Sequence, residues 1–262
     1  MITGAATGIG YKCTKILLRN SAKKVALVDL PTSNGQIAVS TLEKEFGKGR
    51  AIFVACDVTK VDDLKKTFEK IVDVFGGLDI LINNAGIVND KLWEQTIEVN
   101  VKAVIRGSML AFDHMGKHKG GKGGVIVNIS SVAGLHPNYF LPVYSASKHA
   151  ILGFSQSLAR MYDKTGVRVV VMCPGPTITK VLGLRGINIK ARMFDSISAT
   201  VGNSIYVSMA KYANIVQTAE HVALAVLDLI QKGETGAAWV SEERQPPYAV
   251  DFPHYSKRSL SI

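Results

Sequence analysis

Short apolar runs alternate with longer amphipathic segments along almost the whole chain, and this alternation restricts the fold more than any other feature. The runs that read as buried strands are Val25–Asp29, Ala51–Cys56, Asp79–Asn83, Val125–Ser130, Val167–Cys173 and Ala237–Val240. The segments with helical apolar spacing are Gly10–Arg19, Gln36–Phe46, Val61–Phe75, Leu92–Met115, Tyr144–Tyr162 and Thr218–Gln231. Strands that alternate with helices form parallel sheets covered on both faces, joined by right-handed crossovers. The sequence therefore predicts an α/β protein with a doubly wound, mostly seven-stranded parallel sheet.

The amino terminus leaves little room for the first strand of such a sheet. Only Met1–Thr3 precede the glycine at position 4, whereas strands usually run about 5–6 residues. In this topology the first strand lies in the middle of the sheet, where missing pairs leave neighbouring backbone groups unsatisfied. Either the natural chain is longer and Met1 is an internal methionine, or the strand is unusually short. We favour truncation.

A glycine-rich segment opens the first helix. Residues Thr3–Gly10 read TGAATGIG, and a strand ending in Asp29 follows about twenty residues later. Glycines permit a tight turn, and the N–H groups of the helix N-terminus favour a pyrophosphate. A carboxylate after the second strand accepts both ribose hydroxyls of NAD and repels a 2′-phosphate. No Arg or Lys lies in the loop or just after Asp29, so the sequence predicts a Rossmann-type NAD site.

Two further strand ends are candidate cofactor contacts. Asp57-Val58 follows the third strand, where the Asp side chain can meet the adenine amino group or simply cap the next helix. Asn83–Gly86 reads NNAG at the end of the fourth strand, where small residues let a cofactor lie against the backbone. A plain turn is the alternative for this second segment.

The strongest candidates for chemistry are Ser131, Tyr144 and Lys148. Tyr144 and Lys148 are four residues apart on a predicted helix and so share one face. A tyrosine has a pKa near 10 in water. We expect the ammonium of Lys148 and a positive nicotinamide ring to lower it, so that Tyr144 can act as a general base. Ser131 ends the fifth strand and can hydrogen-bond a substrate oxygen.

Composition excludes several other classes of protein. Hydrophobic residues make up 47% of the 262 residues and charged residues 20%, which is typical of a protein with a packed core. No apolar stretch reaches the length of a membrane span. The net charge of +10 is dispersed apart from a basic run at 117–122, and no nucleic-acid-binding motif is present. Cys13, Cys56 and Cys173 have no metal-ligand or disulfide spacing, which predicts no metal site and a cytoplasmic location.

Residues 176–212 interrupt the alternation. They are rich in Ile, Met, Ser and Gly and follow the strand that ends at Cys173. Ligands of doubly wound sheets bind beyond the carboxyl ends of the strands. We therefore expect one dinucleotide-binding and catalytic domain over residues 1–262, with residues 176–212 as a substrate lid. Ordinary surface packing of two short helices is the alternative.

The motifs resemble those of the short-chain dehydrogenase/reductase family in order and spacing. The matching elements are Thr3–Gly10, Asn83–Gly86, Ser131 and the sequence YSASK at 144–148. Thirteen positions separate Ser131 from Tyr144, as in the family; Ser130 fits this spacing less well. The resemblance covers nearly the whole chain.

The resemblance implies a complete set of site residues. Asn100 would hold a water that links Lys148 to solvent, and Lys148 would also bind the nicotinamide ribose. The segment 174–179 would receive the nicotinamide carboxamide, with Thr177 in a place where the family usually has Val or Ile. The expected cofactor contacts are Gly4, Thr7, Gly8, Ile9, Gly10, Asp29, Asp57, Val58, Asn84, Ala85, Gly86, Tyr144, Lys148, Pro174, Gly175, Thr177 and Thr179.

Within the family, the chain is most similar to the NAD-dependent 15-hydroxyprostaglandin dehydrogenases, with the insect alcohol dehydrogenases second. The similarity to the first subgroup lies in residues 88–96, 120–124 and 142–149. That subgroup has a substrate-positioning glutamine three residues before the catalytic Tyr, where this chain has Leu141. The reaction type therefore transfers, and prostaglandin as substrate does not.

We expect an NAD-dependent oxidoreductase that interconverts a secondary alcohol and a ketone. The apolar content of the insert suggests an apolar or lipid-like alcohol. The alternative is a catalytically silent relative that binds a dinucleotide or a lipid. The resemblance also implies a homodimer or homotetramer, with an interface formed by the helices over Leu92–Met115 and Tyr144–Tyr162.

Overall fold

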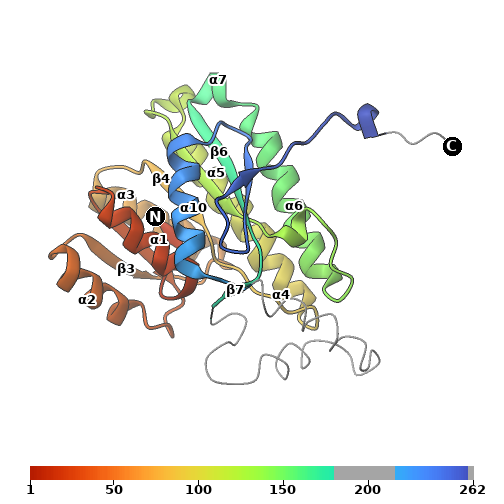
Figure 1. Cartoon of the computed structure of the whole chain (residues 1–262). Helices are drawn as coiled ribbons and strands as arrows, with labels where there is room; N and C mark the ends of the chain where they lie inside the picture. The colour runs from red at the N-terminus through yellow and green to blue at the C-terminus, as the bar shows by residue number, and fades with distance from the viewer. Residues whose placement is uncertain (180–215, 259–262) are drawn as a thin grey trace.

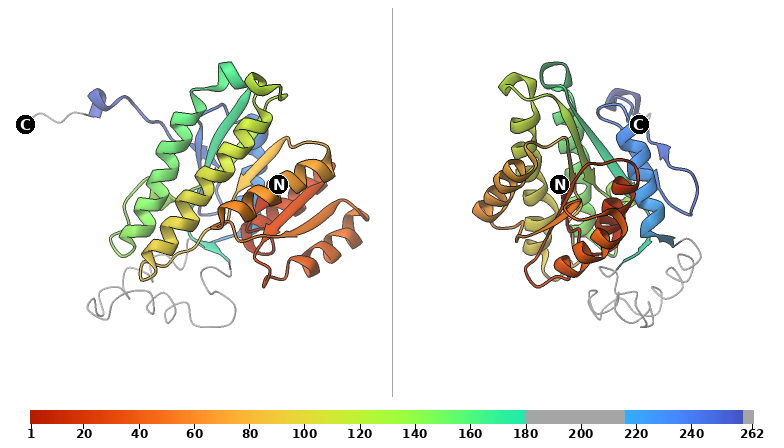
Figure 2. Two further views of the ribbon diagram at one scale, coloured as in Figure 1. Left: turned by 180° about the vertical axis from the view of Figure 1, so that it is seen from behind. Right: turned by 90° about the vertical axis from the view of Figure 1, so that its left-hand side faces the viewer.

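The computed structural model describes residues 1–179 and 216–258, and within them the chain forms one large sheet between two layers of helices (Figures 1 and 2). The sheet has eight strands in the order β10-β9-β6-β5-β4-β1-β2-β3. The strands are β1 (Ile2–Thr3), β2 (Val25–Asp29), β3 (Ala51–Ala55), β4 (Ile80–Asn83), β5 (Gly124–Ile129), β6 (Val167–Pro174), β9 (Ala238–Ser241) and β10 (Tyr248–Ala249). The order changes direction between β4 and β1, which confirms the predicted doubly wound fold.

Helices α1 (Gly8–Arg19), α2 (Gly35–Phe46) and α10 (Ala219–Lys232) cover one face of the sheet. Helices α3 (Val61–Phe75), α5 (Ala103–Met115) and α6 (Pro142–Ala159) cover the other, as the view from behind in Figure 2 shows. Successive strand residues point to opposite faces. On β2, for example, Leu27 packs under α1 and α2, whereas Ala26 and Val28 pack on the opposite side. Both faces of the strands are therefore buried, as parallel sheets require.

The short strand β1 is paired on both sides despite its length. Ile2 pairs with Leu27 of β2 and with Ile82 of β4. Asn84 adds further links, because its Nδ2 donates to the carbonyls of Thr3 at 2.9 Å and Gly4 at 3.0 Å. These side-chain bonds hold the segment after β1 against the end of β4.

The predicted strands and helices agree with the structure to within a few residues, with three differences. The helix predicted over Leu92–Met115 has a π-helical turn, η1 (Glu98–Lys102), between α4 (Trp93–Ile97) and α5. The helix predicted over Tyr144–Tyr162 starts earlier, at Pro142, and is followed by a separate turn, α7 (Tyr162–Thr165). The third difference is β10, which joins β9 in antiparallel orientation and adds an eighth strand to the seven parallel ones.

Short elements connect the framework. They are the 3₁₀ turns η2 (Lys117–Lys119), η3 (Val132–Gly134) and η4 (Tyr255–Arg258), and the strand pair β7 (Thr177–Ile178) with β8 (Gln217–Thr218). The predicted substrate lid, residues 176–212, lies outside the described residues except for 176–179.

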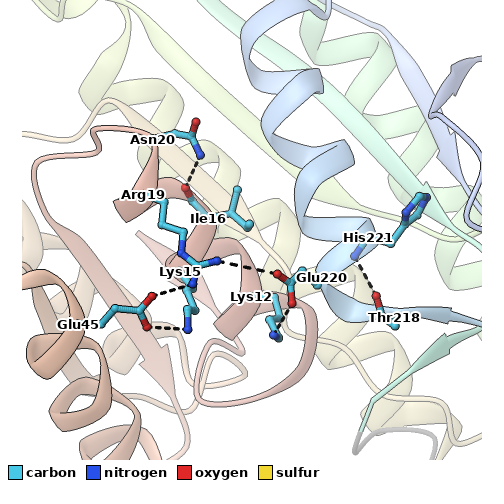
Figure 3. Close-up of polar contacts among 9 residues, drawn as sticks. All are labelled: Lys12, Lys15, Ile16, Arg19, Asn20, Glu45, Thr218, Glu220 and His221. Carbon is cyan, nitrogen blue, oxygen red and sulfur yellow. Dashed lines mark hydrogen bonds and ion pairs between the residues drawn. The ribbon is translucent and has the colours of Figure 1, made fainter.

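Ion pairs join α1 to its two neighbouring helices (Figure 3). Glu45 of α2 accepts from Lys15 at 2.6 Å and from Arg19 at 2.7 Å. Glu220 in the first turn of α10 pairs with Lys12 at 2.7 Å. Exposed pairs of this kind contribute little to stability, because solvent screens them. They connect α1, whose N-terminus carries the glycine-rich segment, to α2 and α10.

Among residues 1–179 and 216–258, none of the helices combines the length and the apolar character needed to cross a membrane.

Candidate active site

A cavity of about 1160 Å³ opens at the carboxyl ends of the parallel strands. It is lined by almost all the residues that the sequence singles out: Gly4, Thr7, Gly8, Ile9, Asp29, Asp57, Val58, Asn84, Ala85, Gly86, Ser131, Tyr144, Lys148, Pro174, Gly175, Thr177 and Thr179. Gly10 and Asn100 lie behind this lining. The structure thus brings segments from the whole chain to one edge of the sheet.

The glycine-rich segment passes so close to its neighbours that side chains are excluded. A Cβ on Gly10 would lie 2.5 Å from the Gly4 carbonyl oxygen and 2.6 Å from Asn84 Nδ2. Gly4 has a φ of +63°, and a Cβ there would lie 2.8 Å from the Ala85 Cα. This packing leaves bare backbone at the N-terminus of α1, which is the cradle that a pyrophosphate requires.

Asp29 ends β2 at the same edge and is held by two backbone donors. The Ala6 N–H donates to Oδ2 and the Leu30 N–H donates to Oδ1, both at 2.8 Å. Each carboxylate oxygen accepts two or more hydrogen bonds, so each keeps capacity for a ribose hydroxyl. The glycine segment and Asp29 together fit a dinucleotide.

Asp57 follows the end of β3, and the sequence left open whether it contacts an adenine or caps the next helix. Its Oδ1 accepts from the N–H of Thr59 at 3.0 Å and from the Thr59 hydroxyl at 2.7 Å. Helix α3 has Lys60 at its N-cap position without a side-chain bond. Asp57 therefore closes a turn beside the cavity and does not cap α3.

Tyr144 and Lys148 project from the first two turns of α6 into the cavity, with Ser131 facing them from the end of β5. Lys148 Nζ lies 5.6 Å from the centroid of the Tyr144 ring and donates to the Ile129 carbonyl at 3.0 Å. The Ser131 Oγ accepts from the N–H of Ala133 at 3.1 Å, which orients the hydroxyl. A phenol, an ammonium and a hydroxyl therefore converge on one space.

Burial sets the protonation of this group. It raises the pKa of Tyr144, and a hydrogen bond with Ser131 opposes part of that rise. Burial also lowers the pKa of Lys148 to about 8. The expected lowering of the Tyr144 pKa depended on a bound nicotinamide ring as well as on Lys148. In the protein alone, desolvation of the phenolate is the largest influence and raises that pKa. The neighbouring Cys173 is a neutral thiol, since burial raises its pKa to about 12.

Asn100 lies in the π-helical turn η1 and braces the wall of the site. Its Oδ1 accepts from the Ile87 N–H at 2.9 Å, and its Nδ2 donates to the Ile87 carbonyl at 2.9 Å. Nδ2 also donates to Ser147 Oγ at 3.1 Å, and that hydroxyl donates to the Tyr144 carbonyl at 2.7 Å. Asn100 thus connects the loop after β4 to the helix that carries Tyr144.

The segment after β6 closes the cavity on the other side. Thr177 is buried, and its hydroxyl donates to the Gly175 carbonyl at 2.8 Å. Thr179 lies across from the glycine segment, because a Cβ on Gly8 would be 3.4 Å from its Cγ2. Both predicted threonines are therefore at the cavity.

One wall of the cavity was not predicted from the sequence, apart from Leu141. It consists of residues 136–141, which follow Ser131. The rings of Tyr139 and Phe140 in this wall are tilted against each other, with centroids 3.8 Å apart. Leu141 is buried within this wall. A run of large apolar residues between Ser131 and Tyr144 is the signal that could have identified it, because both flanking residues belong to the site.

Glu242 and Glu243 line the rim and were also missed. They follow β9 in a turn closed by the Gln245 N–H bonding to the Glu242 carbonyl at 3.0 Å. Glu243 and Arg244 have φ values of +50° and +59°, which residues other than glycine rarely adopt. No glycine marks this turn in the sequence, so it carried no turn signal. In the described part of the chain, no group of three His, Cys, Asp or Glu residues is placed to hold a metal.

Comparison with known proteins agrees with this geometry. The sequence model of the family described as short chain dehydrogenase matches residues 1–186. The chain is 48% identical to a 15-hydroxyprostaglandin dehydrogenase [NAD(+)] of Rattus norvegicus over 184 residues, which cover 70% of this chain and 69% of the relative. It is 30% identical to alcohol dehydrogenase 1 of Ceratitis cosyra over 245 residues, covering 93% and 91%.

A solved structure is similar over most of the chain. The short chain dehydrogenase from Burkholderia cenocepacia in complex with NADP superposes with a TM-score of 0.72 at 28% identity, covering 92% of this chain and 94% of that one. The expected family resemblance, including the prostaglandin and insect subgroups, is thus confirmed.

Proposed function

The chain belongs to the short chain dehydrogenase family, and from that premise we propose that it is an NAD-dependent dehydrogenase that interconverts a secondary alcohol and a ketone. The observation that carries this proposal is the convergence of Ser131, Tyr144 and Lys148 in the cavity that also contains Asp29 and the glycine segment. When bound, NAD supplies the ring that accepts the hydride of the carbinol carbon and a positive charge that favours the Tyr144 phenolate.

The protein's own residues handle the proton and the substrate oxygen. Tyr144 takes the hydroxyl proton during oxidation and returns it during reduction. Ser131 donates a hydrogen bond to the reacting oxygen as its charge changes. Lys148 keeps a positive charge near the phenol while Ile129 holds its ammonium in place. We assign Asn100 the water that links Lys148 to solvent, as the family resemblance implies.

Two features favour NAD over NADP. Asp29 places a negative charge where a 2′-phosphate would lie, and it is fixed there by its two backbone donors. The second feature is the likeness to the rat relative, which is 48% identical and carries NAD in its name. The bacterial structure that holds NADP is less similar, at 28% identity.

Apolar side chains in the lining of the cavity favour an apolar or lipid-like alcohol. Val88, Val132, Phe140 and Leu141 contribute hydrocarbon surface to the cavity. Leu141 replaces the glutamine of the prostaglandin subgroup, so the amide that would position a prostaglandin is missing at this place. We therefore propose the reaction type of that subgroup with a different substrate.

The proposal is tested by NADH formation from a panel of secondary alcohols that includes steroids, terpenoids and hydroxylated fatty-acid esters. We expect turnover on at least one apolar member. Calorimetry that shows NAD binding, together with no turnover on any alcohol, would instead favour a catalytically silent relative.

We also propose that the enzyme is a cytoplasmic homodimer or homotetramer. All three cysteines are buried and unpaired, which suits a reducing compartment. Trp93 and Met109, on the helices α4 and α5, are 52% and 43% exposed, which a subunit contact would cover. A monomeric mass in light scattering would contradict this assembly.

A further inference from the structure

Asp90 caps the helix that carries Tyr144, although it lies more than fifty residues earlier in the chain. Its Oδ2 accepts from the Val143 N–H at 2.7 Å, and its Oδ1 accepts from the Tyr144 N–H at 3.1 Å. Asp90 belongs to the loop between β4 and α4 and does not line the cavity.

These two bonds satisfy every remaining donor in the first turn of α6. Helix N-termini leave N–H groups without an intrahelical partner. Here the first residue is Pro142, which has no N–H, and the Ser145 N–H already bonds to the Leu141 carbonyl at 2.9 Å. Leu141, at the N-cap position, offers no side-chain acceptor. Only the N–H groups of Val143 and Tyr144 remain, and Asp90 accepts both.

The loop that carries Asp90 is itself fixed to two other elements. Asn100 in η1 holds the backbone of Ile87 on both sides. The Asn89 Oδ1 accepts from the N–H groups of Lys91 and Leu92 at 3.2 Å, and the Thr96 hydroxyl donates to the Asn89 carbonyl at 2.7 Å. The loop between β4 and α4 is therefore held by several hydrogen bonds, and it places the carboxylate of Asp90 at the first turn of α6.

We propose that Asp90 is a positioning residue for the reaction, resting on the function proposed above. It fixes the backbone of Tyr144 by capping α6 across the loop, and its negative charge suits the positive end of the helix. Tyr144 lies in the first turn, which frays when a cap is lost, whereas Lys148 lies one turn deeper. Loss of the cap should therefore displace the phenol and leave the other expected cofactor contacts in place.

The first test compares Asp90→Ala and Asp90→Asn with wild type. We expect Asp90→Ala to lower kcat about tenfold, with the Kd for NAD changed less than twofold, because a small displacement of a catalytic group is costly. Asp90→Asn keeps one acceptor and should lose about threefold. The matched control is Lys91→Ala, which alters an exposed side chain beside Asp90 in the same loop and should change kcat less than twofold.

The second test does not depend on activity. Hydrogen exchange of the protein without ligands should show faster exchange of the Val143 and Tyr144 amides in Asp90→Ala, with the second half of α6 unchanged. An unchanged kcat, an equal loss in Lys91→Ala, a parallel loss of NAD affinity or unchanged exchange at residues 143–144 would each overturn the proposal. If wild type oxidises no alcohol, the proposed function fails, and hydrogen exchange still decides the role of Asp90.

Discussion

Replacing Asp29 by Asn should weaken NAD binding and remove the discrimination against NADP. The substitution preserves the shape of the side chain and removes its charge. It also exchanges one carboxylate oxygen for an NH₂ group, which cannot accept from the Ala6 or Leu30 N–H groups that now bond Asp29 at 2.8 Å. Both consequences act where the ribose binds.

The size of the effect follows from the hydrogen bonds of the carboxylate. Each oxygen uses one acceptor position for the backbone and has one left for a ribose hydroxyl. A hydrogen bond to a charged group is worth about 1.5–3 kcal/mol. Loss of one such bond in Asp29→Asn corresponds to a roughly tenfold higher Kd for NAD, since about 1.4 kcal/mol is a factor of ten. Loss of both in Asp29→Ala, about 3 kcal/mol, corresponds to roughly a hundredfold.

NADP should respond in the opposite direction. Two unit charges about 4 Å apart repel by about 1 kcal/mol in water and about 4 kcal/mol near a protein surface. Removal of the Asp29 charge should therefore improve NADP binding at least fivefold, by the smaller of these figures. Only a group beside the 2′-position is expected to move the two affinities in opposite directions.

Isothermal titration calorimetry with NAD and NADP measures both affinities on one preparation. The matched control is Asp113→Asn, which makes the same charge change on the exposed end of α5. Its NAD to NADP ratio should equal that of wild type. Wild type binding the two cofactors equally, or an unchanged ratio in Asp29→Asn, would refute the assignment of Asp29.

Two further predictions concern the glycine segment and Lys148. Gly10→Ala should reduce NAD affinity more than tenfold and destabilise the fold by about 1–3 kcal/mol, because the new Cβ meets backbone at 2.5 Å. Its control is Gly153→Ala on the exposed side of α6, where a new Cβ would have nothing within 4 Å. This control should raise the free energy of unfolding by about 0.5–1 kcal/mol. Equal stability of the two variants in denaturant unfolding would contradict the prediction. Burial lowers the pKa of Lys148 from 10.5 to about 8. Between these two pH values the unfolded state binds more protons than the folded state. The free energy of unfolding therefore rises with pH across this window, by up to about 3 kcal/mol from this group. The stability difference between wild type and Lys148→Met, measured at pH 7 and pH 10, should shift in favour of wild type at the higher pH; a constant difference would show that the buried ammonium is not the cause.

The sequence contained most of the fold because its strands are buried on both faces. Val25–Val28 and Val169–Cys173 read as continuous apolar runs, which are typical of strands in a covered parallel sheet. Strand β10 lacked such a signal, since Tyr248 and Ala249 are exposed and follow two prolines. The π-helical turn around Asn100 was not predictable either, because it depends on bonds to Ile87 that the helical spacing does not reveal.

Part of the candidate site could likewise be predicted from the sequence, and part could not. Motif residues such as Asp29 and Tyr144 were found because their chemistry and their spacing point to one function. Asp90 was not singled out from the sequence, because only the fold brings it to the first turn of α6. The rise in the pKa of Tyr144 in the protein alone was not predicted either, since burial is a property of the tertiary structure.

The most direct test of the proposed function is the pH dependence of NAD-linked oxidation in wild type and Tyr144→Phe, with Tyr162→Phe as the control. Tyr162 is partly exposed on α7 and does not line the cavity. Because burial raises the pKa of Tyr144 and oxidation needs the phenolate, kcat/KM of wild type and of the control should rise with pH. Tyr144→Phe should be slower by about 10²–10⁴-fold while it still binds NAD. A Tyr144→Phe enzyme that keeps the wild-type rate and the wild-type pH profile would contradict the role assigned to Tyr144.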